Sequence, residues 1–85
     1  MSKHLTFPCA FPLKVMGANT GDFETLVVSI VGKHTSPLAE GAVTTRLSRG
    51  GKYLSVTVNI TAESQEQLDA IYRELSAHER VLMML

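Results

Sequence analysis

Apolar and polar residues alternate along the two segments that flank Gly50-Gly51. After the glycines, Leu54 to Ile60 is apolar at every second position, and Val43 to Leu47 follows a similar period before them. A period of two places neighbouring side chains on opposite faces, which predicts two half-buried strands. The glycines predict a hairpin turn between them, because tight hairpins need positive φ and glycine adopts it without strain.

The alternation also predicts the register of this hairpin. If the two glycines form the loop, Leu47 faces Leu54 and Val43 faces Val58. This register sorts both strands into an apolar and a polar face, whereas a slip by one residue would mix the faces. It also places two basic residues opposite each other beside the turn, so a longer loop stays open.

The segment before the hairpin predicts a strand and a helix. Residues 11–16 alternate and predict the first strand. Five apolar residues then follow a helical spacing: Phe23, Leu26, Val27, Ile30 and Val31. This stripe predicts a helix over residues 21–33, with Asn19 or Thr20 as its cap. The β-branched content of this segment makes a strand the alternative.

The segment after the hairpin predicts a second helix and a final strand. Ser64 and Gln67 have the spacing of a capping box at a helix start. Four apolar residues continue as a helical stripe: Leu68, Ile71, Tyr72 and Leu75. The apolar run from Val81 to Leu85 is too short for a helix, so it predicts a strand.

The predicted order is strand, helix, strand, strand, helix, strand. Each helix has one apolar stripe and the hairpin has one apolar face, so two helices on one side of a four-stranded antiparallel sheet bury all of them. Right-handed crossovers give the strand order 4-1-3-2, which is the ferredoxin-like βαββαβ sandwich of the α+β class. We expect residues 1–9 to be a flexible tail and residues 10–85 to form one domain. A helical pair with a loose hairpin is the alternative.

Composition narrows the functional classes. The 85 residues include eight acidic and eight basic side chains, and the basic ones are scattered along the sequence. This pattern gives no support for binding nucleic acid or an anionic membrane by charge alone. Cys9 is the only cysteine, so no internal disulfide forms. The sequence shows no signal peptide and no apolar run of membrane-spanning length, which predicts a cytoplasmic protein.

The predicted fold leaves one face of the sheet uncovered. We expect Lys14, Tyr53 and Ser55 to share this face on the two central strands. The last strand is apolar on both sides, so part of it must point away from the helices. Met16, Leu82 (or Met83), Met84 and Tyr53 then form an apolar patch, which indicates contact with an unknown protein partner or self-association. Scattered surface hydrophobics are the alternative interpretation.

The candidates for catalysis are weak, and we predict no catalytic residue, no cofactor and no metal site. His4, His34 and His78 fall in the tail and at two helix ends, without the spacing of metal ligands. Cys9 has no base beside it that the sequence identifies. The carboxylates of the second helix lie opposite its apolar stripe and predict a solvated face.

Two binding alternatives remain open. Gly17 and Asn19 link the first strand to a helix N-terminus, where a glycine lets a small-molecule effector approach backbone N–H groups. A plain tight connection with a cap explains the same residues. RNA binding is the other alternative, but single-strand readers of this architecture stack bases on two or three sheet aromatics, and Tyr53 stands alone.

Several segments resemble the YbeD-like family of small bacterial proteins of unknown function. The matching pieces are Phe7-Pro8, Phe11-Pro12, Lys14-Val15-Met16-Gly17, Gly51-x-Tyr53-x-Ser55-Val56, Gln67-Leu68, Ile71-Tyr72, Glu74-Leu75 and the ending from Val81 to Leu85. The resemblance implies a ferredoxin-like fold similar to ACT regulatory domains, which bind amino acids at subunit interfaces, and it implies no catalytic residue. We therefore expect a non-enzymatic regulatory or interaction domain that acts through its open face or an edge, with an ACT-like sensor as the alternative.

Overall fold

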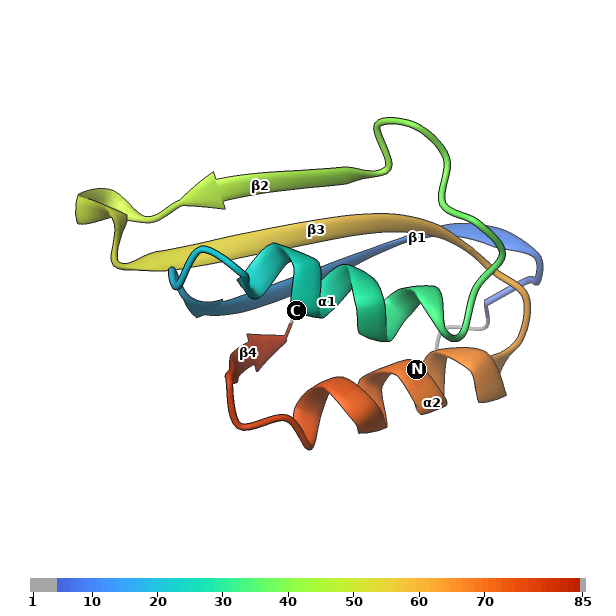
Figure 1. Ribbon diagram of the computed structural model, residues 1–85. Helices are drawn as coiled ribbons and strands as arrows, with labels where there is room; N and C mark the ends of the chain where they lie inside the picture. The colour runs from blue at the N-terminus through green and yellow to red at the C-terminus, as the bar shows by residue number, and fades with distance from the viewer. Residues whose placement is uncertain (1–4, 85) are drawn as a thin grey trace.

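The computed structural model describes residues 5–84 and has two layers (Figure 1). Four strands and two helices follow the predicted order: β1 (Cys9–Ala18), α1 (Phe23–Gly32), β2 (Val43–Leu47), β3 (Tyr53–Ala62), α2 (Gln65–Ser76) and β4 (Val81–Met84). Both helices pack on one side of the sheet, and β2 lies at the edge away from them (Figure 1). Neither helix of the described residues has the length and apolar content to cross a membrane.

The sheet has the strand order β2-β3-β1-β4, with every neighbouring pair antiparallel. Read from the other edge, this is the predicted order 4-1-3-2, and the predicted ferredoxin-like sandwich is confirmed. The hairpin register is also confirmed, since Leu47 pairs with Leu54 and Val43 with Val58. The helices cover the inner face because it carries the apolar set of both central strands, including fully buried Leu13, Val15, Val56 and Val58.

The hairpin turn is longer than two residues. Arg49–Gly51 forms a short 3₁₀ turn, with φ at +83° for Gly50 and +72° for Gly51. The N–H of Ser48 donates to the carbonyl of Tyr53 at 2.9 Å, which closes the loop one pair beyond the predicted position. The requirement for positive φ at both glycines is confirmed, and the longer loop keeps the neighbouring basic residues from pairing directly.

Element boundaries differ from the prediction at both ends of the first strand and helix. β1 starts at Cys9, where a partly buried side chain packs against the core, and it runs to Ala18. Part of the expected tail, residues 1–4, lies outside the described residues, and Phe7 packs against the core. Asp22, rather than Asn19 or Thr20, occupies the N-cap of α1, and its side chain makes no capping bond.

The second helix begins as predicted. The Oγ of Ser64 accepts a hydrogen bond from the N–H of Gln67 at 3.1 Å, and the Gln67 side chain returns to accept from the N–H of Glu63 at 2.6 Å. The Gln67 amide also donates to the carbonyl of His34 at 2.8 Å. The bond from Gln67 to His34 ties the start of α2 to the end of α1, so the two helices are held together at this end of the layer.

Candidate functional site

The open face is the side of the sheet that no helix covers. Its side chains come from alternate positions of three strands: Lys14, Met16, Thr44, Arg46, Tyr53, Ser55, Thr57 and Asn59. Pairing aligns these residues in rows across the strands. Lys14 faces Thr57 on β3, and Thr57 faces Thr44 on β2. The predicted sharing of this face by Lys14, Tyr53 and Ser55 is therefore seen in the register.

A shallow hollow occupies the middle of the open face. Lys14 and Arg46 border it, and the hydroxyl groups of Ser55 and Thr57 lie between them; Thr44 and Thr45 complete the lining. Met16 faces Ser55, and Ser55 faces Arg46, so the two cations sit on a diagonal across β3. Hydroxyls and cations together make this hollow suited to hydrogen-bonding an anionic or polar group.

Tyr53 lies at the hairpin end of the open face. Its side chain is 37% exposed, and the Nζ of Lys52 lies 5.8 Å from the centre of its ring. That distance fits a weak cation–π contact at an exposed site. The Tyr53 N–H donates to the Oγ of Ser48 at 3.0 Å, which fixes the residue at the start of β3. Tyr53 is thus an anchored, accessible aromatic group beside a cation.

Charge on this protein is sorted by layer, which the sequence analysis missed. None of the eight acidic residues lies on a strand; all lie on the helices or in loops. Four of the eight basic residues lie on the strands or in the hairpin turn: Lys14, Arg46, Arg49 and Lys52. Arg46, Arg49 and Lys52 are close in sequence, and the strand order adds Lys14 from β1, two strands away from Arg46. The net charge of zero is therefore the sum of a positively charged sheet and a negatively charged helical layer.

Gly17 is closely packed against Phe23 and Arg80. A β-carbon at this buried position would lie 2.4 Å from Cε1 and 2.5 Å from Cζ of Phe23, and 2.6 Å from the carbonyl oxygen of Arg80. The ring of Phe23 therefore occupies the space that the missing side chain leaves. The glycine serves close packing between β1, α1 and the approach to β4.

The loop after Gly17 uses its polar groups internally. The amide of Asn19 donates to the carbonyl of Gly51 at 3.1 Å, which ties the loop to the hairpin turn. Thr20 donates to the carboxylate of Asp22 at 2.8 Å, and Arg80 donates to that carboxylate and to Thr20. These bonds hold the start of α1 against the approach to β4.

The ion pair at this loop shifts two pKa values. Hydrogen bonds from Arg80, and then from Thr20, hold the pKa of the Asp22 carboxyl well below its usual range. The same contact with Asp22 raises the pKa of Arg80. Asp22 is exposed, so the pair is screened by solvent and adds little to stability. The side chains of Asn19, Thr20 and Asp22 are thus used within the chain, whereas the first backbone N–H groups of α1 receive no side-chain cap.

The apolar patch on the last strand has a different membership from the predicted one. Met84 pairs with Val15 and packs against the core, so it points inward. Met83 pairs with Met16 on the outer side and is 51% exposed, and Leu82 is 58% exposed. A register shift then follows between Met16 and Gly17, so that Gly17 pairs with Val81 and Leu82 is skipped in the pairing. The outer patch therefore consists of Met16, Leu82 and Met83.

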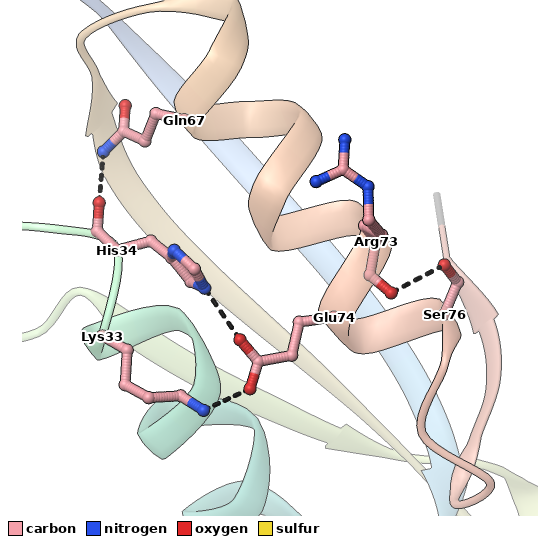
Figure 2. A network of polar contacts seen from close by, with 6 residues as sticks. All are labelled: Lys33, His34, Gln67, Arg73, Glu74 and Ser76. Carbon is pink, nitrogen blue, oxygen red and sulfur yellow. Dashed lines mark hydrogen bonds and ion pairs between the residues drawn. The ribbon is translucent and has the colours of Figure 1, made fainter.

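A polar network joins the two helices on the far side of the molecule (Figure 2). Glu74 on α2 contacts the Nζ of Lys33 and the Nε2 of His34, the latter at 2.8 Å. Both partners, Lys33 first, lower the pKa of the Glu74 carboxyl. The guanidinium of Arg73 points away from this network (Figure 2). The network holds the ends of the two helices together. Arg73 lies outside it and remains a cation of the acidic helical layer.

The remaining candidates for catalysis or metal binding are the histidines and Cys9. The Nδ1 of His78 accepts from the N–H of Arg80 at 3.3 Å, and His34 belongs to the helix network. Cys9 is partly buried on β1, and His4 lies outside the described residues. Within residues 5–84, no three His, Cys, Asp or Glu side chains lie close enough to hold a metal ion.

A second hollow lies between the loop after α1 and the end of β3. Thr35, Pro37, Leu38 and Asn59 are among its lining residues. The Oγ1 of Thr35 is buried and has no hydrogen-bond partner among the described residues. The residue as a whole is only half-buried, so this hydroxyl does not define a ligand site.

The fold and the open face together define a class: a small ferredoxin-like α+β domain with an uncovered sheet face. The solution structure of protein HP0495 from H. pylori shares this fold, with a TM-score of 0.77 over 99% of this chain and 88% of that chain, at 18% sequence identity. That likeness concerns the fold alone.

The chain belongs to the family described as "Protein of unknown function (DUF493)", whose model matches residues 2–85. A UPF0250 protein of Neisseria gonorrhoeae is 48% identical over 81 residues, covering 95% of this chain and 89% of the relative. Another from Chromobacterium violaceum is 46% identical over 79 residues, covering 93% and 89%. The predicted membership in a family of small bacterial proteins of unknown function is confirmed, and the family description names no enzymatic activity.

Proposed function

We propose that this chain is a non-enzymatic protein-interaction domain that acts through its open face. The observation that carries the proposal is the position of Lys14, Ser55 and Tyr53 on the one sheet face without helices. Tyr53 and Arg46 on this face belong to the residue types that protein interfaces favour, and Lys14 and Ser55 add charge and hydrogen-bonding groups beside them. The side chains of His34, His78 and Asn19, in contrast, form hydrogen bonds within the chain.

Affinity capture from the source cell tests the proposal. We expect the double variant Lys14→Ala, Tyr53→Ala to lose specific partners that the parent chain captures. The matched control is Arg73→Ala with Tyr72→Phe, which changes a cation and an aromatic residue on α2 and should retain those partners. Identical captured proteins with the open-face variant and the parent would contradict the proposal.

Self-association through the edge of β4 is a second route for the same kind of function. One edge of β4 pairs with β1, and its other edge has no strand beside it in the sheet. Leu82 and Met83 expose more than half of their surface on this strand. An exposed apolar edge strand tends to pair with another strand, since its backbone N–H and C=O groups remain available.

The small-molecule sensor and the RNA-binding module receive less support. The sensor hypothesis depends on Gly17 and Asn19, and packing against Phe23 and a bond to Gly51 account for these residues. A thermal-shift screen against amino acids decides it, because a bound effector would raise the unfolding temperature. The RNA hypothesis needs stacking aromatics, and Tyr53 is the one aromatic residue on the described open face.

A further inference from the structure

We infer that the open face binds an acidic polypeptide segment, whose carboxylates lie over Lys14 and Arg46. This inference rests on the proposed function and deepens it, because it names the chemistry of the partner. Carboxylates form charge-assisted hydrogen bonds with lysine and arginine that are shorter and stronger than neutral ones. The hydroxyls of Ser55 and Thr57, which lie between the two cations, add donors for the peptide groups or side chains of the segment.

The two cations have their charge available for another chain. The ion pairs seen within residues 5–84 use Lys33, His34 and Arg80 as the cationic partners. Each of those three contacts an acidic residue of the helices or loops. Lys14 and Arg46 are exposed on strands that carry no acidic residue, so no carboxylate stands beside them on the sheet.

The opposite charges of the sheet and the helical layer favour a negatively charged partner at the open face. The sheet and its hairpin turn bring four basic residues together, whereas every acidic residue lies on the helices or loops. Complementary potentials speed encounter and exclude partners with the wrong charge. A cationic or neutral segment would gain no charge attraction from Lys14 and Arg46. An acidic segment is attracted to the open face and repelled by the helical layer.

Two other occupants fit this surface less well. A twofold contact between two open faces would bring two cationic surfaces together, and like charges at an interface are unfavourable. A single-stranded nucleic acid binds such sheets by stacking successive bases on aromatic side chains. The five aromatic residues here leave Tyr53 alone on the open face; Phe7, Phe11 and Phe23 pack in or against the core, and Tyr72 lies on α2.

Strand geometry sets the spacing of the carboxylates. Lys14 and Arg46 lie two strands apart and are offset by one same-face position. With strands about 4.8 Å apart and a rise of about 3.3 Å per residue, their Cα atoms are roughly 12 Å apart. An extended segment covers this distance in about four residues. Two acidic residues spaced by four therefore match the two cations.

The direct test is a titration of the ¹⁵N-labelled full chain, followed by NMR chemical shifts. The probe is an unstructured Gly/Ser/Thr peptide with two glutamates spaced by four; matched peptides carry glutamine or lysine at these positions, and an oligouridylate of equal length serves as the nucleic-acid probe. We expect the glutamate peptide to shift the amides of Lys14, Arg46 and Ser55. The shifts should shrink as salt is added, since screening weakens contacts between exposed charges.

Charge-neutralising variants complete the test. Lys14→Gln with Arg46→Gln should weaken binding of the glutamate peptide by about tenfold. Lys33→Gln with Arg73→Gln removes the same charge from the helical layer and should not weaken it. The dispersion of each variant's spectrum shows whether the chain is folded.

The outcomes of the titration distinguish an acidic partner from the alternatives. Equal binding of the glutamine peptide at the open face would overturn the acidic partner while leaving the proposed interaction face intact. Tighter binding of oligouridylate at the same residues would overturn it in favour of nucleic acid. Shifts confined to the helices, or none with any probe, would also overturn it, while affinity capture decides the proposed function separately.

Discussion

Gly17 is the position at which one added carbon should disturb the packing under the end of β1. A β-carbon there meets the ring of Phe23 and the backbone of Arg80, all within 2.6 Å. We expect Gly17→Ala to lower the free energy of unfolding by about 1–3 kcal/mol, as overpacking of a core usually does. Urea denaturation measures the change.

Gly32→Ala is the matched control for this substitution. A β-carbon at Gly32, which ends α1, would meet no atom within 4 Å apart from its chain neighbours and the backbone of its own helix. Alanine is also a better helix former than glycine, so stability should stay the same or rise by up to about 1 kcal/mol. If both variants were equally stable, the close-packing role of Gly17 would be wrong.

Asp22 gives a prediction about pH. Hydrogen bonds from Arg80 and Thr20 favour the charged carboxylate, so its pKa is lowered in the folded chain. A lowered carboxyl pKa means that its contribution to stability is present above the unfolded value of about 4 and is lost as the pH falls through the folded value. Because the group is exposed, the contribution itself is small.

Carboxyl NMR titration checks this prediction. We expect Arg80→Gln to move the Asp22 midpoint upward toward its ordinary value, because the first of its hydrogen-bond donors is removed. Arg73→Gln removes a cation that points away from the neighbouring polar network and should leave the midpoint in place. An unchanged Asp22 midpoint in the Arg80 variant would contradict the assigned cause.

Individual residues of the candidate site were only partly predictable from the sequence. Alternation placed Lys14, Tyr53 and Ser55 on one face, because side-chain direction in a strand follows from position alone. The role of Gly17 depends on the ring of Phe23, which the chain brings back only after a loop. The bond from Asn19 to Gly51 joins residues far apart in sequence, so a local pattern contains no sign of it.

Among the strands and helices, β4 gives the most specific prediction, which concerns self-association. Pairing of two β4 edges predicts a dimer whose contacts include Leu82 and Met83. We expect Leu82→Glu with Met83→Glu to produce a monomer, because burying two unpaired charges in an apolar contact is costly. Light scattering coupled to size-exclusion chromatography measures the mass.

Leu47→Glu provides the control at the other edge of the sheet. Leu47 is 54% exposed on β2, so this change adds charge to an apolar edge residue without touching β4. The Leu47 variant should keep the mass of the parent. A parent chain with monomeric mass would rule out self-association through β4 under those conditions.

The type and order of the elements were predictable because every pattern was consistent. Apolar stripes predicted both helices, and one register satisfied both faces of the hairpin. The details that failed depend on contacts between elements. Pairing with Val15 places Met84 inward and pairing with Met16 places Met83 outward, and the register shift beside Met16 puts Val81 rather than Leu82 opposite Gly17. An isolated four-residue apolar run gives no indication of this register.

At the scale of the whole molecule, topology sorts the charges. Arg46 on β2 and the two cations of the following turn are close in sequence, whereas Lys14 comes from β1 and joins the same sheet face only after the sheet forms. The acidic residues stay on the opposite layer and in loops. Net charge and linear spacing therefore underestimate how strongly the two faces of this protein differ.

Site-specific photocrosslinking in the source cell tests most directly whether the open face is the interaction surface. A photoreactive phenylalanine analogue replaces Thr44, which is exposed on the open face, or Asp69, which is exposed on α2. We predict discrete protein adducts from position 44 that disappear when Lys14 and Tyr53 are replaced by alanine, and no such adducts from position 69. Adducts from position 69 alone, or adducts from position 44 that survive both substitutions, would contradict the account.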